Sequence, residues 1–320
     1  MTKYLPFCTL SLLSLIASST AFAGFYHGVV NATSEPSTPK KVEPPLFYES
    51  PCPMEIDLSL GVDDFRGIYS GSFNDSFGGL TALNLTFPFQ HYFTMQFGGS
   101  YGLYDWSGRS STPYKNSKSL EQQAFVTAAI NWLTPSTSGW HAGAAFDWVW
   151  TRNFGQFAVN PDVDQVRAQV GYLIKGGNEI GAWATYGLHS DREKSQHISL
   201  KFKAISQVNL FWCHYFKNNG YGMLWGGVPY KRGLKYTSGP AGRFIIGAQF
   251  SIPLTHSLSL DGHGSYMDPR GGSGITPSKN YGANVYFGLT YAYGKRRVIK
   301  NPYMNIANNS NFMIDTNQNF

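Results

Sequence analysis

Hydrophobic residues alternate with polar or small residues in repeated stretches of this chain. The clearest stretch is 282–293, where Val285, Phe287 and Leu289 share one parity and Asn284 falls on the other. A side-chain period of two is that of a β-strand and excludes a helix face. A strand of about 11 residues, tilted by about 45°, is long enough to cross the hydrocarbon core of a bilayer. The stretch therefore predicts a strand with one hydrophobic face.

The same alternation recurs at strand length along the chain. The connections alternate too, because short turns are followed by longer segments rich in Gly, Ser, Asn, Lys and Pro. Together these regularities predict an all-β fold, a single antiparallel transmembrane β-barrel of about 12 strands with short periplasmic turns and long outer loops. The predicted strands are 56–62, 83–89, 93–103, 120–132, 140–150, 166–172, 180–188, 198–204, 208–212, 244–254, 258–266 and 282–293.

Two segments leave the strand count open. Residues 221–228 have the composition of a strand, which would make the count odd, and we interpret them as part of a loop excursion above the membrane. In 311–320, Phe312 and Ile314 share a parity, but the density of Asn and Asp argues against a further strand. We therefore expect residues 295–320 to extend into the periplasm, beginning with a basic cluster beside the membrane.

The N-terminal region has the features of an exported protein. An apolar run at 5–16 follows a basic residue, and the triplet Ala21-Phe-Ala23 suits signal peptidase. The next segment is rich in Pro, Ser, Thr, Lys and Glu and lacks apolar periodicity, which predicts a linker. The predicted organisation is a signal peptide at 1–23, a Pro-rich linker at 24–53, a β-barrel at 54–294 and a periplasmic C-terminal tail at 295–320.

Composition agrees with a membrane barrel. Charged residues make up 14% of the chain, aromatic residues make up 16%, and there are 35 glycines. The formal charge of +6 is a mild excess. Without Lys3 of the predicted signal peptide it is +5, and the four basic residues at 295–300 account for nearly all of that, so it does not indicate a nucleic-acid surface. Cys52 and Cys213 are the cysteines beyond the signal peptide. We expect them not to be bonded, because Cys213 lies about six residues up its strand from the periplasmic turn, whereas Cys52 precedes the first strand at the periplasmic rim.

The predicted signal peptide, the alternating strands and the aromatic-rich closing strand resemble those of porin-like outer-membrane β-barrel proteins of Gram-negative bacteria. The phrases Gln207-Val-Asn-Leu-Phe-Trp212 and Ala307-Asn-Asn-Ser-Asn-Phe-Met-Ile-Asp-Thr-Asn317 are similar to an uncharacterised family of bacterial envelope proteins without an assigned activity. The resemblance implies the cell outer membrane as location, with outer-membrane lipid and the barrel-assembly machinery as partners. The chain departs from such barrels by continuing beyond Tyr293.

Charges of both signs occupy the parity opposite to the hydrophobic face. Such charges suit a water-filled lumen, so we expect a passive channel or small-solute porin with weak ion selectivity, and small solutes or ions as ligands. A plugged structural barrel or envelope anchor is one alternative, and a secreted soluble β-sandwich is another, because parity does not tell which face is wet. The predicted lumen-lining residues are Asp57, Glu121, His141, Asp147, Arg167, Glu179, Lys201, Lys203, Arg243, Asp261 and His263.

Catalytic signals are weak. His197 with Ser199, and His263 with Ser265, each place a base and a hydroxyl on one strand face, which faintly resembles outer-membrane phospholipase. A barrel hydrolase is therefore the last alternative. Because both pairs lie on the polar parity, they are more typical of lumen residues, and we expect no enzyme. The sequence has no metal-ligand spacing and no phosphate-binding glycine loop, so we expect no metal, no cofactor and no nucleic-acid partner.

Overall fold

All residues that can be described belong to one of two compact units of the chain, Pro45–Phe320. The predicted signal peptide, the Pro-rich linker and the basic cluster at 295–300 lie outside the described residues. The computed structural model describes residues 54–67, 76–90, 92–105, 120–133, 139–154, 158–195, 198–217, 219–234, 239–269, 282–293 and 304–317.

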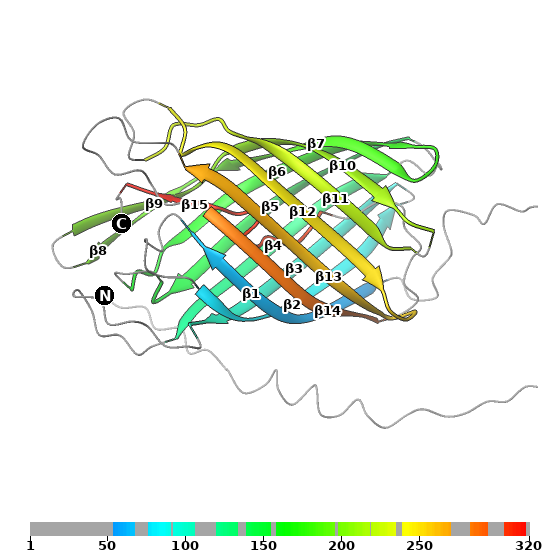
Figure 1. The fold of residues 1–320 in the computed structure, drawn as a ribbon, viewed down its shortest axis with the longest axis horizontal. Helices are drawn as coiled ribbons and strands as arrows, with labels where there is room; N and C mark the ends of the chain where they lie inside the picture. Colours follow the sequence, from blue (N-terminus) through cyan, green and yellow to red (C-terminus); the bar gives the residue numbers. More distant parts are fainter. Residues whose placement is uncertain are drawn as a thin grey trace, which may run out of the picture. The chain divides into compact units, whose positions relative to one another are not determined.

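Twelve of the described strands close into one antiparallel barrel, in the order β1-β14-β13-β12-β11-β10-β7-β6-β5-β4-β3-β2 (Figure 1). Closure leaves no barrel edge unpaired, because β1 bonds to β14 along its length as well as to β2. The predicted all-β barrel of about 12 strands is confirmed. The barrel strands are β1 (Glu55–Arg66), β2 (Ser76–Gln90), β3 (Phe93–Tyr104), β4 (Glu121–Leu133), β5 (Gly139–Arg152), β6 (Asp162–Ile174), β7 (Asn178–Gly187), β10 (Gln207–Tyr215), β11 (Tyr221–Pro229), β12 (Gly242–Pro253), β13 (Leu258–Pro269) and β14 (Gly282–Tyr293).

The outer surface of the barrel is hydrophobic. Val285, Phe287 and Leu289 of β14 are about half exposed, as their parity predicts, and Leu60 is 70% exposed. A soluble sandwich would bury these side chains between its sheets, so this surface excludes that alternative. Exposed aromatic residues occur along the wall, and those near the short turns occupy the position of an interfacial girdle in membrane barrels. They include Phe89, Tyr92, Trp140, Trp212, Phe216 and Tyr293. In the described ranges no helix has the length and apolar character needed to cross a bilayer.

The predicted strand count is right, but two of the segments exchange roles. Residues 198–204 were expected in the barrel wall, whereas β7 pairs directly with β10 and bypasses them. They form β9 (Ile198–Ala204), which pairs with β8 (Ser190–Ser195) and with β15 (Ile314–Thr316) in a separate three-stranded sheet. The apolar face of β9 meets protein instead of lipid, because Leu200 and Phe202 are almost fully buried.

The vacant place in the wall is taken by β11, which includes the segment 221–228 that we interpreted as a loop. Leu224 and Val228 face outward and are about half exposed, while Trp225 is buried on the inner side. Glycines hide this strand in the sequence because they carry no hydrophobic signal. A glycine on the paired strand β12 makes room for β11, because a Cβ at Gly247 would clash with the Trp225 ring.

The barrel has a short-turn end and a long-loop end. The turns β2–β3, β4–β5, β6–β7, β10–β11 and β12–β13 lie at the short-turn end, and the β6–β7 turn is three residues long. Gly176 and Gly177 in that turn have φ of 98° and 84°, which glycine adopts without strain. The segments that join the strands at the other end are longer, as predicted, and the sheet of β8, β9 and β15 lies there (Figure 1).

We expect a charge on the outer surface to destabilise the barrel according to its depth. Leu60 lies near the middle of β1, and Leu254 lies in the β12–β13 turn with 53% of its surface exposed. Leu60→Arg should lower the free energy of unfolding by about 2–4 kcal/mol and Leu254→Arg by about 0–1 kcal/mol, because only the first places a charge in hydrocarbon. Urea unfolding from lipid vesicles measures both. Equal losses would contradict a membrane-spanning wall.

Candidate functional site

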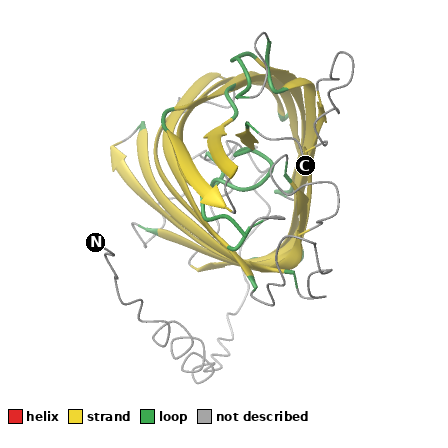
Figure 2. Cartoon of the chain, turned by 90° about the vertical axis from the view of Figure 1, so that its left-hand side faces the viewer, coloured by secondary structure: helices red, strands yellow, loops and turns green. Residues whose placement is uncertain are grey.

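The C-terminal segment, which we define as residues 304–317, lies inside the barrel and not beyond it. This corrects the predicted periplasmic tail for these residues. Met304, Ala307, Phe312 and Ile314 are each at most 3% exposed. The view along the barrel from its long-loop end shows non-strand segments within the ring of strands (Figure 2). The segment runs from Met304 in the short-turn half to β15 at the long-loop end, where it pairs with β9.

A buried ion pair on the wall holds the first half of the segment. Arg167 Nε and Nη2 donate to the two carboxylate oxygens of Asp147 at 2.5 and 2.9 Å, and both side chains are almost fully buried. Arg167 Nη2 also donates to the Asn305 carbonyl at 2.6 Å. Thr127 Oγ1 donates to Asp147 at 2.9 Å and accepts from the Ala307 N–H at 2.9 Å. The pair therefore serves the wall and the segment together, as a charge buried in protein requires.

A second polar centre lies around Asp63, near the long-loop end of β1. Tyr104 Oη and Asn284 Nδ2 donate to its carboxylate from the wall at 2.8 and 2.5 Å. Asn309 of the segment donates from the lumen to Asp63 at 3.1 Å and to Gln123 Oε1 at 2.9 Å. Amide side chains both donate and accept, so an Asn-rich segment can satisfy a wall of mixed polarity. The same Asn density that argued for a solvated tail thus explains why it binds inside.

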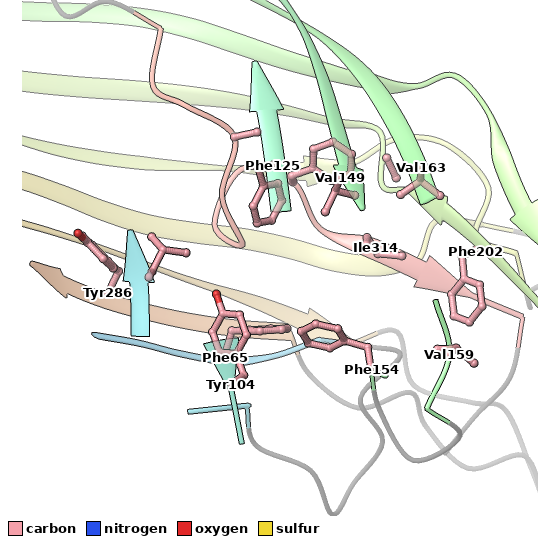
Figure 3. Packing of buried hydrophobic residues seen from close by; sticks show 14 of the residues in the cluster. Phe65, Tyr104, Phe125, Val149, Phe154, Val159, Val163, Phe202, Tyr286 and Ile314 are labelled. Atoms are coloured by element: carbon pink, nitrogen blue, oxygen red, sulfur yellow. The ribbon is translucent and has the colours of Figure 1, made fainter. Parts of the chain in front are cut away.

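The long-loop half of the lumen is closed by a hydrophobic core. Phe312 stacks edge to face on Phe125 of β4 with ring centroids 5.8 Å apart, and Ile314 pairs with Ala204 of β9. Figure 3 shows this cluster, in which Phe202 lies near Ile314 and Phe154 packs against Phe65 and Tyr104. These side chains fill the lumen here, and the described residues leave a cavity of only about 20 Å³ beside Phe312 and Ile314.

Wall glycines make room for the segment in the other half. A Cβ at Gly98 would come within 2.6 Å of Ile306 Cγ1, and a Cβ at Gly143 would come within 2.9 Å of the Met304 side chain. Any larger residue at these positions would overlap the segment, so either the segment or the wall strand would have to move. The wall and the segment are therefore shaped to each other.

Most of the predicted lumen residues lie on the inner face. Besides Asp147 and Arg167, His141 Nε2 contacts Glu179 Oε1 at 2.7 Å, and Tyr215 Oη donates to Glu179 at 2.6 Å, with His141 and Glu179 buried. Glu121 is buried and accepts from Ser76 Oγ at 3.0 Å. Asp57, Asp261 and His263 line a cavity described below.

The prediction is wrong for three of the lumen residues. Lys201 and Lys203 lie on β9 and so are not in the barrel wall at all. Arg243 has inward parity, but the register of β12 and β13 shifts between Gly242 and Ile245. This irregularity turns the guanidinium outward, where the side chain is 64% exposed and lies 3.7 Å from Asp268. Without these three cations, Arg167 is the one Lys or Arg of the predicted set that lies on the inner face of the barrel.

A cavity of about 310 Å³ remains in the short-turn half, between the wall and the C-terminal segment. Its wall side is formed by β1, β2, β3 and β10 to β14, and its inner side by residues 304–308. His263 stacks on Tyr286 there, with ring centroids 4.8 Å apart. His263 with Ser265 thus faces the protein interior. Across the described residues no group of three or more His, Cys, Asp or Glu side chains is placed to hold a metal ion.

Several site residues were missed by sequence reasoning. Asp63 and Asn284 lie on the inner parity of β1 and β14, next to residues that were selected, and parity alone could have found them. Asn305 and Asn309 of the C-terminal segment were not considered for the lumen. Their signal is the run of amides itself, which matches the polar lumen better than it matches a free tail.

The closed wall, the hydrophobic band and the occupied lumen define an outer-membrane β-barrel protein. The chain belongs to a family of unknown function (DUF6666), whose sequence profile matches residues 55–314. No curated protein matches it.

Solved outer-membrane barrels share the fold at low sequence identity. The COG4313 outer membrane channel from Pseudomonas putida F1 has 10% identity and a TM-score of 0.50, covering 76% of this chain and 96% of that chain. A Pseudomonas aeruginosa FadL homologue has 9% identity and a TM-score of 0.41, covering 78% and 91%. The Salmonella typhi outer membrane phospholipase dimer has 11% identity and a TM-score of 0.41, covering 73% and 90%. These likenesses concern the fold alone.

We expect the buried ion pair to be a main source of stability. Arg167→Gln leaves Asp147 buried without its cation and should lower the free energy of unfolding by about 3–5 kcal/mol. Arg152→Gln is the matched control, because its ion pair with Asp162 is 3.8 Å long and both side chains are more than a third exposed; it should lose less than about 1 kcal/mol. Urea unfolding in lipid vesicles measures both. Similar losses would show that the pair contributes no more than a surface contact.

Proposed function

We propose that the protein is a small-solute channel of the outer membrane that its own C-terminal segment holds closed. The observation that carries this proposal is the position of residues 304–317, which fill the lumen from the Arg167–Asp147 pair to the core around Phe312. An open porin with weak ion selectivity, the function favoured by the sequence, needs a continuous water path. The closed long-loop half supports the plugged alternative for the state described here.

Passage then requires the segment to move. The Arg167–Asp147 pair stays satisfied within the wall by Thr127 and Gln165, whose Nε2 donates to Asp147 at 3.0 Å. Loss of the segment therefore leaves the buried charges paired with each other, which lowers the free-energy difference between the closed and open states. A bistable segment of this kind is the ordinary basis of a switch.

The location and chemistry of the proposal follow from the chain as a whole. The predicted signal peptide at 1–23 supports export, and the hydrophobic outer surface supports insertion from the periplasm into the outer membrane. We also propose that the protein acts without catalysis, because passage through a lumen needs no bond to be broken. One of the similar solved barrels, from Pseudomonas putida F1, is named an outer membrane channel, so a barrel of this fold is compatible with the proposal.

A purely structural barrel is the second candidate. The observation in its favour is the hydrophobic core of Phe125, Phe202, Phe312 and Ile314, because dry packing resists displacement. The two candidates differ in whether the segment ever leaves, so a covalent lock on the segment separates them.

We expect a disulfide between β9 and β15 to silence the channel. Ala204 and Ile314 are paired across an antiparallel ladder, where Cα atoms are about 4.5–5.5 Å apart and suit a disulfide. Ala204→Cys with Ile314→Cys is made in a background with Cys52→Ser and Cys213→Ala. In planar bilayers the reduced protein should show rare stepwise openings under voltage, and the oxidised protein should show none.

The background without the added cysteines, with and without oxidant, is the control. Steady conductance of the oxidised protein would contradict closure by the segment. Silence of both the background and the reduced variant at every voltage would contradict a channel and support the structural barrel. Restoration of the openings by a reductant would tie them to the one bond introduced.

A further inference from the structure

The cavity in the short-turn half is lined by acids and by no Lys or Arg of the described residues. Glu55 and Asp57 on β1 and Asp261 on β13 contribute carboxylates, on the two strands that flank β14. No Lys or Arg of the described chain lines it, and the remaining polar groups are amides, hydroxyls and His263. Acidic residues alone do not make a site, because they are often simply solvated.

Buried polar atoms without partners give an independent indication of a ligand. Gln96 is 1% exposed, and its Nε2 already donates to Asn84 at 2.9 Å and to the Met304 carbonyl at 2.6 Å. Its Oε1 accepts no hydrogen bond from any described residue. Ser100 Oγ and Tyr286 Oη, in side chains that are 7% and 5% exposed, are also without described partners. All three residues line the cavity, and a buried unpaired polar group is costly enough to require an explanation.

The unused atoms are mainly acceptors. The free atom of Gln96 is a carbonyl oxygen, and Asp261 uses Oδ2 to accept from Ser259 at 3.1 Å while its buried Oδ1 accepts from no described residue. A ligand that fits must therefore donate hydrogen bonds, and the carboxylates favour one that is positively charged. An ammonium group has three donors, no acceptor and a full charge.

The size of the cavity and its aromatic lining restrict the class of ligand further. A cavity of about 310 Å³ is at the lower end of the range for small-molecule sites. It is too large to be filled by one metal ion. The stacked rings of Tyr286 and His263 offer faces for methylene groups or for a cation. We propose that this cavity binds a small organic cation that carries primary ammonium groups on a short aliphatic chain.

This inference rests on the proposed function, because it names the solute class that would occupy the lumen below the closed segment. It replaces the weak ion selectivity expected from balanced wall charges. The three cations that balanced them, Lys201, Lys203 and Arg243, do not line this cavity. Fixed negative charge raises the local concentration of cations, so selection begins at the entrance.

Isothermal titration of the full-length protein in detergent with putrescine tests the proposal. We expect one site per chain, with no binding of 1,4-butanediol, which lacks the charge, or of succinate, which reverses it. The double variant Asp57→Asn with Asp261→Asn should weaken binding at least tenfold, because both charges face the ligand. Each single variant should weaken it less, which keeps the test valid if the double variant folds poorly.

Asp191→Asn is the matched control, because Asp191 lies on β8, at the long-loop end, and does not line the cavity. It should bind putrescine as the wild type does. Absence of putrescine binding, equal binding of 1,4-butanediol, or an equal loss in Asp191→Asn would overturn the proposal. Binding that is seen only after Lys295, Arg296, Arg297 and Lys300 are all replaced by Gln would also overturn it, because the cations would then come from the chain itself.

The disulfide-locked variant distinguishes this inference from the proposed function. Putrescine should bind the locked protein as tightly as the wild type, since the cavity is present with the segment in place. If the lock leaves conductance unchanged while binding persists, closure by the segment is wrong and the cation site stands. If the lock silences the channel and putrescine does not bind, the closure stands and the cation site is wrong.

Discussion

The structure depends on the need to give every buried polar group in the lumen a partner. The inner wall carries the buried polar residues Asp63, Asp147, Arg167 and Gln123. Facing lipid, or unpaired in a dry lumen, such groups would cost several kcal/mol each. Water can meet this need in a wide barrel. Here the C-terminal segment meets it, because the Asn305 backbone carbonyl accepts from Arg167 and the Asn309 side-chain amide donates to Gln123 and Asp63. The wall and the segment therefore form one polar network.

The same network explains how one barrel has two different halves. At the long-loop end, the segment adds Phe312 and Ile314 to a hydrophobic core that occupies the lumen. At the short-turn end, its backbone leaves a cavity in which acceptors such as Gln96 Oε1 are unsatisfied within the described chain. Under the proposed function, a solute that enters from this end would reach the proposed cation site and then the hydrophobic core around Phe312. This is the arrangement expected of a vestibule below a plug.

Much of the fold could be predicted from parity, and the failures have a common physical cause. Alternation identifies a strand with one hydrophobic face, but it does not state whether lipid or protein covers that face. β9 has such a face and packs it against the C-terminal segment, whereas β11 carries glycines that weaken its alternation and still forms part of the wall. The two errors offset each other, so the predicted number of strands was right although the membership was wrong.

The lumen residues followed the same rule. Asp147, Arg167 and Glu179 lie where parity places them, whereas Arg243 is turned outward by an irregularity in the ladder that no sequence pattern marks. The C-terminal segment could not be placed from its own sequence, because an Asn-rich stretch is equally suited to water and to a polar lumen. The segment binds in the lumen because the wall, assembled from strands far apart in the chain, offers its amides hydrogen-bond partners in place of water.

Hydrogen exchange of the backbone amides in 305–317, in the full-length protein in lipid, tests most directly whether the segment fills the barrel. Several of these amides donate to partners inside the barrel, such as Ala307 to Thr127 Oγ1 and Phe312 to the Asn308 carbonyl. They should therefore exchange slowly, with protection comparable to that of the barrel strands. Exchange within seconds across the whole segment would show that it is solvated, and would contradict the plugged lumen on which the proposed function rests.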